Sequence, residues 1–111
     1  MSSSIHSTHY ADSPDLALAA LRHPPLEQAL SAACAQLAVR EAFLAALRDP
    51  AIGPQPRLLL AVSGADIRGQ RRLAALLAEL LPDEVELDLI ELADDNLSRA
   101  VRERCEPFYN T

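Results

Sequence analysis

The stretch from residue 57 to residue 92 constrains the fold most, because it places a helix between two strands of different character. Arg57 to Ser63 contains five consecutive apolar residues, the pattern of a central strand covered on both faces. Leucines then recur at helical spacing over residues 73–80, and Pro82 ends that helix. Over residues 84–89 acids alternate with valine or leucine, which predicts a second strand. Two such strands should be parallel, with a right-handed crossover.

Prolines delimit the segments before this unit. Ser13-Pro14-Asp15 has the pattern of a helix start and predicts a short helix over residues 16–22, which Pro24-Pro25 would end. Pro25 then opens a second helix, in which apolar residues recur every three or four positions from Leu26 to Leu37. After the βαβ unit, Asp94 or Asp95 is expected to cap a last helix.

Residues 39–49 are ambiguous on the residues alone. Their alanines favour a helix, whereas the alternation of Val39, Glu41, Phe43, Ala45 and Leu47 suits a strand. The loop that follows, over residues 49–56, contains three prolines and a glycine.

With 111 residues, half of them hydrophobic, the chain has the size of one domain. We expect residues 1–11 to be a disordered, Ser- and His-rich tail, in which His6 and His9 are solvated, and residues 12–111 to be the single domain. No apolar run reaches the length of about 18 residues that a membrane span needs. The N-terminus lacks the pattern of a signal peptide, so a bacterial cytoplasmic location is expected.

The charge of the chain argues against nucleic acid as a partner. The formal net charge is −6, which repels a phosphate backbone unless basic residues cluster. All ten basic residues are arginines, and two groups of three occur, Arg68, Arg71 and Arg72 in one and Arg99, Arg102 and Arg104 in the other. We expect both groups to be solvated helix faces whose arginines pair with nearby acids.

No pattern for catalysis, a metal or a cofactor is recognisable. Gly64 to Arg72 lies where a phosphate-binding loop would lie, but Gln70 and Arg71 replace its lysine and hydroxyl residue, so a plain strand-to-helix turn is expected. His23 is interpreted as a cation near a helix C-terminus. The two cysteines, Cys34 and Cys105, fall on apolar helix faces and are predicted to be packed core thiols rather than a disulfide or a reactive site.

The acidic residues offer one candidate surface. Eight acids and no base occur between Glu79 and Asp95, and Glu84, Glu86 and Asp88 would share one face of a strand. Such a stripe is typically solvated or faces a partner; metal binding or acid–base catalysis by paired carboxylates is the remaining alternative.

From Pro25 to Tyr109 the chain resembles the C-terminal domain of the bacterial enhanced serine sensitivity protein SseB family. The segments that carry the resemblance are the opening helix, Val39-Arg40-Glu41-Ala42-Phe43-Leu44, the strand from Val85 to Leu92, and the ending Pro107-Phe108-Tyr109. Basic residues that follow this ending in the family are replaced here by Asn110-Thr111, and we expect the protein to lack the larger N-terminal domain of full-length members.

The resemblance implies that residues 39–47 form a strand, hairpinned to Arg57–Ser63. The expected fold is then a small α+β or α/β domain with a roughly three-stranded mixed sheet, helices packed on it, and the order α-α-β-β-α-β-α. The family transfers no catalytic residues. The leading hypothesis is a non-enzymatic adaptor or regulatory module that binds another protein, with a homodimer as one form of such binding. The alternatives are an amino-acid sensor and a secretion- or toxin-associated adaptor or immunity protein.

Pro107, Phe108 and Tyr109 are interpreted as a structural C-terminal motif. Pro107 should stop the last helix and let the chain leave extended. We expect Phe108 to fold back onto the core near the helix from Leu26 to Leu37, with the Tyr109 hydroxyl at the surface or in one hydrogen bond. The alternative is an exposed docking motif.

Overall fold

The computed structural model describes residues 4–7, 17–48, 56–82 and 86–110. Its elements are β1 (Ser4–Ser7), β2 (Ala17–Ala20), α1 (Pro24–Ala35), β3 (Glu41–Arg48), β4 (Arg57–Ser63), α2 (Ile67–Leu80), β5 (Glu86–Glu91), α3 (Asn96–Arg104) and β6 (Tyr109–Asn110).

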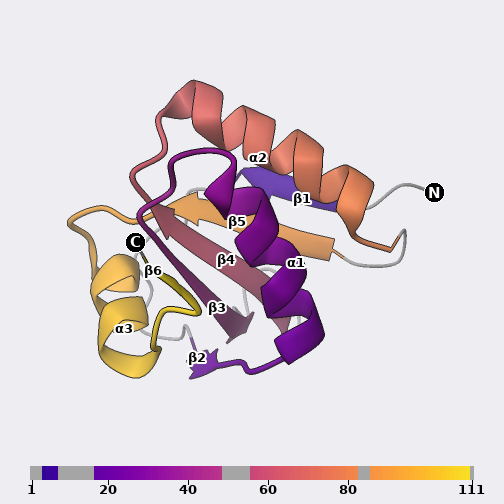
Figure 1. Ribbon diagram of the computed structural model, residues 1–111. Helices are drawn as coiled ribbons and strands as arrows, with labels where there is room; N and C mark the ends of the chain where they lie inside the picture. Colours follow the sequence, from indigo (N-terminus) through magenta and orange to yellow (C-terminus); the bar gives the residue numbers. More distant parts are fainter. Residues whose placement is uncertain (1–3, 8–16, 49–55, 83–85, 111) are drawn as a thin grey trace.

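The strands form one mixed sheet in the order β1-β5-β4-β3-β2 (Figure 1). β3 and β4 are an antiparallel hairpin, and β4 and β5 are parallel and joined by α2, as predicted. The parallel strand β1 and the antiparallel strands β2 and β6 enlarge the expected three-stranded sheet. β2 and β6 both pair with β3, β2 along Ala45–Arg48 and β6 along Glu41–Ala42, so two segments share the outer side of one strand.

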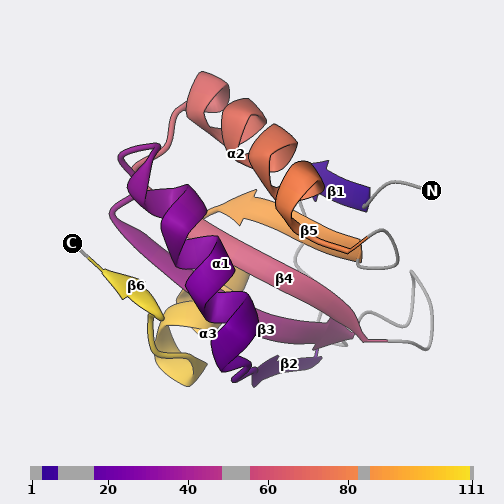
Figure 2. The same ribbon diagram turned by 45° about the vertical axis from the view of Figure 1, so that its right-hand side comes forward.

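Helices cover both faces of the sheet. α1 and α2 lie on one face and α3 lies on the other (Figures 1 and 2). On β3, Ala42 and Leu44 belong to the core under α1 and α2, whereas Phe43, Ala45 and Leu47 belong to the core under α3. This alternation follows from the two-residue period of a strand. It explains why β3 and β4 are apolar on both faces, and the α+β class is confirmed.

Each helix begins at a side-chain cap. The Asp66 carboxylate accepts a hydrogen bond from the Gly69 amide at 2.7 Å, and the Asp95 carboxylate accepts one from the Ser98 amide at the same distance. Asp95 is thus the cap that the sequence offered as one of two choices. In the described residues, no helix combines the length and the apolar character needed to cross a membrane.

The short helix predicted over residues 16–22 is wrong. Residues 17–20 are the strand β2, paired in register with β3 from Ala17 opposite Arg48 to Ala20 opposite Ala45. Alanine and leucine have high intrinsic helix propensity, but a helix of about two turns between prolines is marginal by itself. Pairing with β3 satisfies the same backbone groups and lets Leu18 pack against the core under α3. The expected cap at residues 13–15 lies outside the described residues.

Part of the tail expected to be disordered is ordered. Ser4–Ser7 forms β1, a parallel edge strand beside β5 in which Ser4 is opposite Glu86 and Ser7 is opposite Leu89. The other residues of the segment 1–11, His9 included, lie outside the described residues. The polar composition gave no indication of β1, because this strand depends on pairing with β5, which is far away in the sequence.

Candidate functional site

Of the three acids predicted to form a docking stripe, the structure describes the side chain of Asp88 alone. Asp88 is buried, with its side chain 2% exposed, and it forms a bidentate ion pair with Arg57 of β4. Arg57 Nε donates to Asp88 Oδ2 at 2.6 Å and Nη2 donates to Oδ1 at 3.0 Å. Asp88 lies opposite Leu59, and Arg57 is two residues earlier on β4, so the two side chains meet diagonally on the same face.

The prediction for the other two acids is not tested. Glu84 lies outside the described residues, as does the side chain of Glu86, whose backbone pairs with Ser4 of β1. β5 therefore has neighbours on both sides and is an interior strand. The alternation was correctly recognised as a strand, but the identification of Asp88 as a partner-facing residue is wrong, because Arg57 neutralises it inside the fold.

A second polar cluster lies where β4 ends. The Glu41 carboxylate accepts hydrogen bonds from Ser63 Oγ at 3.2 Å and from Arg102 of α3 at 3.0 Å. The Arg102 guanidinium also lies 6.0 Å from the centroid of the Phe43 ring. These contacts tie α3 to β3 and β4. Because the Glu41 carboxylate is already bound to Arg102 and Ser63, we interpret this cluster as a structural contact.

The turn from β4 into α2 resembles a phosphate-binding loop in position only. Gly64 has a φ of 94°, and a Cβ there would lie 2.9 Å from Cγ of Arg40, so this residue must be glycine. At the N-terminus of α2 the Gly69 amide donates a hydrogen bond to the Asp66 carboxylate, so this amide is not available to a phosphate. This contact supports the interpretation of a plain strand-to-helix turn.

His23 has a different role from the one predicted. It is the N-cap of α1, where Nδ1 accepts a hydrogen bond from the Leu26 amide at 3.2 Å. The His23 amide in turn donates to the Glu27 carboxylate at 2.6 Å, and Arg22 pairs with the same carboxylate at 3.3 Å. The interpretation of His23 as a cation at a helix C-terminus is wrong because the helix that would precede it is the strand β2.

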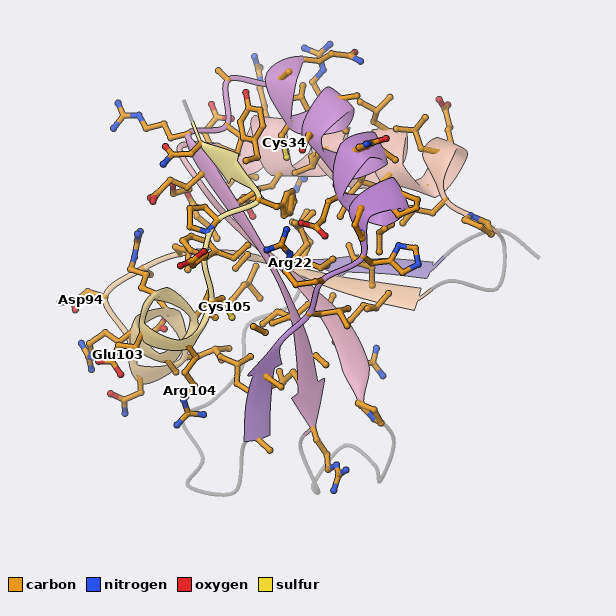
Figure 3. All side chains as sticks on the ribbon, turned by 60° about the horizontal axis from the view of Figure 1, so that its bottom comes forward. Arg22, Cys34, Asp94, Glu103, Arg104 and Cys105 are labelled. Atoms are coloured by element: carbon orange, nitrogen blue, oxygen red, sulfur yellow. The ribbon has the colours of Figure 1, made fainter. Side chains whose placement is uncertain are left out.

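The two cysteines are free and buried in different layers. Cys34 belongs to α1 and Cys105 is the C-cap of α3 (Figure 3), and each thiol lies within the core on its own side of the sheet. Burial raises the pKa of the Cys34 thiol to about 11 and also raises the pKa of Cys105, which the charge of Arg104 lowers in part. Both are core thiols, as predicted. No group of three potential metal-ligating side chains occurs in the part of the chain that the structure describes.

The C-terminal motif is built into the fold. Tyr109 begins β6 and pairs with Ala42, and the Phe108 amide donates to the Ala42 carbonyl at 3.0 Å. Phe108 and Tyr109 are both half-buried and pack against the core under α1 and α2. Phe108 therefore lies near α1, where the sequence analysis placed it, and Tyr109 contributes more to packing than expected.

The feature that sequence analysis missed is the sheet edge at β2. Ala17, Ala19 and Ala20 are exposed and Leu18 is half-buried. The strand carries no charge and borders a shallow, mainly apolar hollow of about 290 Å³, which we call the β2 hollow; it is lined by Ala17, Leu18, Ala19, Ala46, Arg48 and Pro56. The sequence Ala-Leu-Ala-Ala has a high helix propensity, so it gave no indication of an edge strand.

Comparison with known protein families agrees with this architecture. The model of the family described as SseB protein C-terminal domain matches residues 16–111, from the residue before β2 through β6. The chain belongs to the SseB C-terminal domain family. The β2 edge is therefore part of the SseB C-terminal domain, although the segments that carry the sequence resemblance begin at Pro25. β1 lies before the match. No curated protein matched the chain, and no solved structure did.

Proposed function

We propose that this domain is a non-enzymatic protein-binding module whose docking edge is β2. The observation that carries the proposal is an exposed, uncharged edge strand beside the apolar β2 hollow. Natural edge strands usually carry charges, prolines or bulges that prevent pairing with other chains. The Ala-Leu-Ala-Ala sequence of β2 has none of these, so its outer side suits an added strand.

The hollow indicates what the added segment contains. Its lining is mainly apolar, and among the described residues that line it the exposed Arg48 is the single charged one. An extended segment along β2 would place alternate side chains over the hollow. We infer a partner segment with small or medium apolar residues and one carboxylate within reach of Arg48.

The polar clusters support a binding role over a catalytic one. Asp88 is engaged by Arg57, and Glu41 is engaged by Ser63 and Arg102. Both cysteine thiols have raised pKa values, which lowers their nucleophilicity near neutral pH. A nucleophile needs an adjacent base that activates it, and these contacts do not form such a pair.

The test is affinity capture from the native cell followed by hydrogen exchange on the purified complex. The variant Ala17→Asp/Ala19→Asp places charges on the docking edge, and Ala32→Asp/Ala35→Asp places the same charges on exposed positions of α1 as a matched control. We expect the wild type and the control to capture the same protein, the β2 variant to lose it, and amide protection to increase at β2.

Two results would contradict the proposal. If the variant Ala17→Asp/Ala19→Asp captured the same protein as the wild type, the docking site would not be at β2. A metabolite that stabilises the domain, by about 2.7 kcal/mol at a hundredfold excess over its dissociation constant, with no captured protein, would establish the ligand-sensor alternative.

A further inference from the structure

A second surface, on α2, has properties that β2 lacks. Arg68, Arg71 and Arg72 are exposed, and because Arg71 and Arg72 lie three and four residues after Arg68, all three share one face of α2. The buried residues Leu73 and Leu77 hold the opposite face against the core. We call the three arginines the α2 arginine face.

The arginines of this face differ from most others in the molecule. Arg22, Arg57, Arg99 and Arg102 each pair with a carboxylate. Within the described ranges, Arg68, Arg71 and Arg72 form no ion pair. The expectation that both arginine groups pair with nearby acids therefore holds for Arg99 and Arg102 of α3 and fails on α2.

Two acids that contact the first turns of α2 bind groups other than the three arginines. The Asp66 carboxylate caps the helix through the Gly69 amide, and the Glu91 carboxylate accepts a hydrogen bond from Gln70 at 2.7 Å. Three guanidinium groups thus remain available at the N-terminal half of a helix, where the helix dipole adds to their positive potential. This concentration of positive charge contrasts with the net charge of −6.

An apolar side chain adjoins the arginines and narrows the choice of ligand. Ile67 is 70% exposed, more than any other large hydrophobic side chain in the described part of the chain, and it lies one helical turn before Arg71. Guanidinium groups bind carboxylates through two parallel hydrogen bonds, and an exposed isoleucine adds an apolar contact. A nucleic acid would meet the repulsion of the whole acidic protein over a longer contact.

We propose that the α2 arginine face and Ile67 bind an acidic protein segment that carries an apolar residue among its carboxylates. This surface is separate from the proposed β2 edge. α2 packs against β1 at one end of the sheet, β2 lies at the other end, and α1 lies between them (Figures 1 and 2). The two proposals can therefore fail independently.

The test measures fluorescence anisotropy of a labelled peptide composed of Asp and Glu with one central Leu, at low and at physiological salt. The variant Arg68→Gln/Arg71→Gln/Arg72→Gln removes the face. The matched control, Arg22→Gln/Arg99→Gln/Arg104→Gln, removes three exposed arginines elsewhere and so has the same net charge. We expect at least a tenfold loss of affinity in the first variant and less than a twofold change in the second. Ile67→Ser should weaken binding severalfold at both salt concentrations.

Each other outcome would overturn the proposal. An equal loss in the two triple variants would show an effect of bulk charge, and no binding by the wild type at low salt would exclude this ligand class. Tighter binding of a single-stranded DNA of equal charge would assign the surface to nucleic acid. Circular dichroism confirms that each variant is folded before binding is measured. The β2 variant Ala17→Asp/Ala19→Asp should bind the peptide like the wild type, which separates this test from that of the proposed function.

Discussion

The buried Asp88–Arg57 pair makes a quantitative prediction about stability. Asp88 is 2% exposed and its carboxylate receives two hydrogen bonds from one guanidinium, whose own side chain is 30% exposed. Removing one member of a fully buried ion pair typically costs about 3–5 kcal/mol, because the other charge is left uncompensated. Arg57 keeps partial access to water, so Asp88→Ala should lower the free energy of unfolding by about 2–3 kcal/mol.

Removing both charges should behave differently from removing one. Arg57→Leu/Asp88→Leu leaves no buried charge, and replacing a buried ion pair by apolar side chains is often neutral or stabilising. We therefore expect the double variant to regain most of the stability that Asp88→Ala loses. Glu91→Ala, on the same strand but exposed, is the matched control and should change stability by less than about 0.5 kcal/mol.

Urea unfolding followed by circular dichroism measures these differences. The midpoint should fall in Asp88→Ala with little change in slope, and the melting temperature should fall by about 10–20 °C for a domain of this size. The reasoning would be refuted if Asp88→Ala were as stable as Glu91→Ala. It would also be refuted if the double variant were no more stable than Asp88→Ala, because lost packing would then explain the effect.

Three further predictions concern single residues. Phe108→Ala should lower the free energy of unfolding by about 2–3 kcal/mol in a urea melt, less than a fully buried phenylalanine would, because the ring is half-buried; an unchanged midpoint would favour the docking-motif alternative. Gly64→Ala should cost about 1–2 kcal/mol in the same assay because its φ is 94°, and a neutral result would mean that the turn relaxes. Cys34, with a pKa of about 11, should resist alkylation at pH 8 until urea unfolds the protein. Since the unfolded thiol loses its proton first, stability should fall as pH rises from 9 towards 11, and this loss should be smaller in Cys34→Ala.

The βαβ unit and the cap at Asp95 could be predicted because their signals are local, whereas the hairpin of β3 and β4 followed only from the family resemblance. Periodicity marks β4, α2 and β5, and family resemblance resolved β3. The strands β1 and β2 could not be predicted, because a Ser-rich segment and an Ala-Leu-Ala-Ala segment become strands only through pairing with β5 and β3.

The surface position predicted for Asp88 was wrong for a related reason. Whether Asp88 faces water depends on Arg57, which is far away in the sequence and meets it only in the folded sheet. Conversely, the arginines of α2 could be recognised as a cluster, but only the structure shows that Asp66 and Glu91 are bound elsewhere. Side-chain pairing across elements decides which charges are available to a ligand, and sequence spacing reports only which charges are neighbours on one element.

The pairing of β1 with β5 has a consequence for how the protein is made. Ser4 lies opposite Glu86, so β1 can pair only after the ribosome has synthesised β5 and the whole of the chain between them. β6, at the other end of the chain, completes the outer side of β3 later still. Contacts between residues so distant in sequence slow folding, because a long loop must close before they form. The nascent domain therefore holds an unfinished sheet until its last residues emerge, and during that interval a chaperone or a binding partner has access to backbone edges that the mature protein covers.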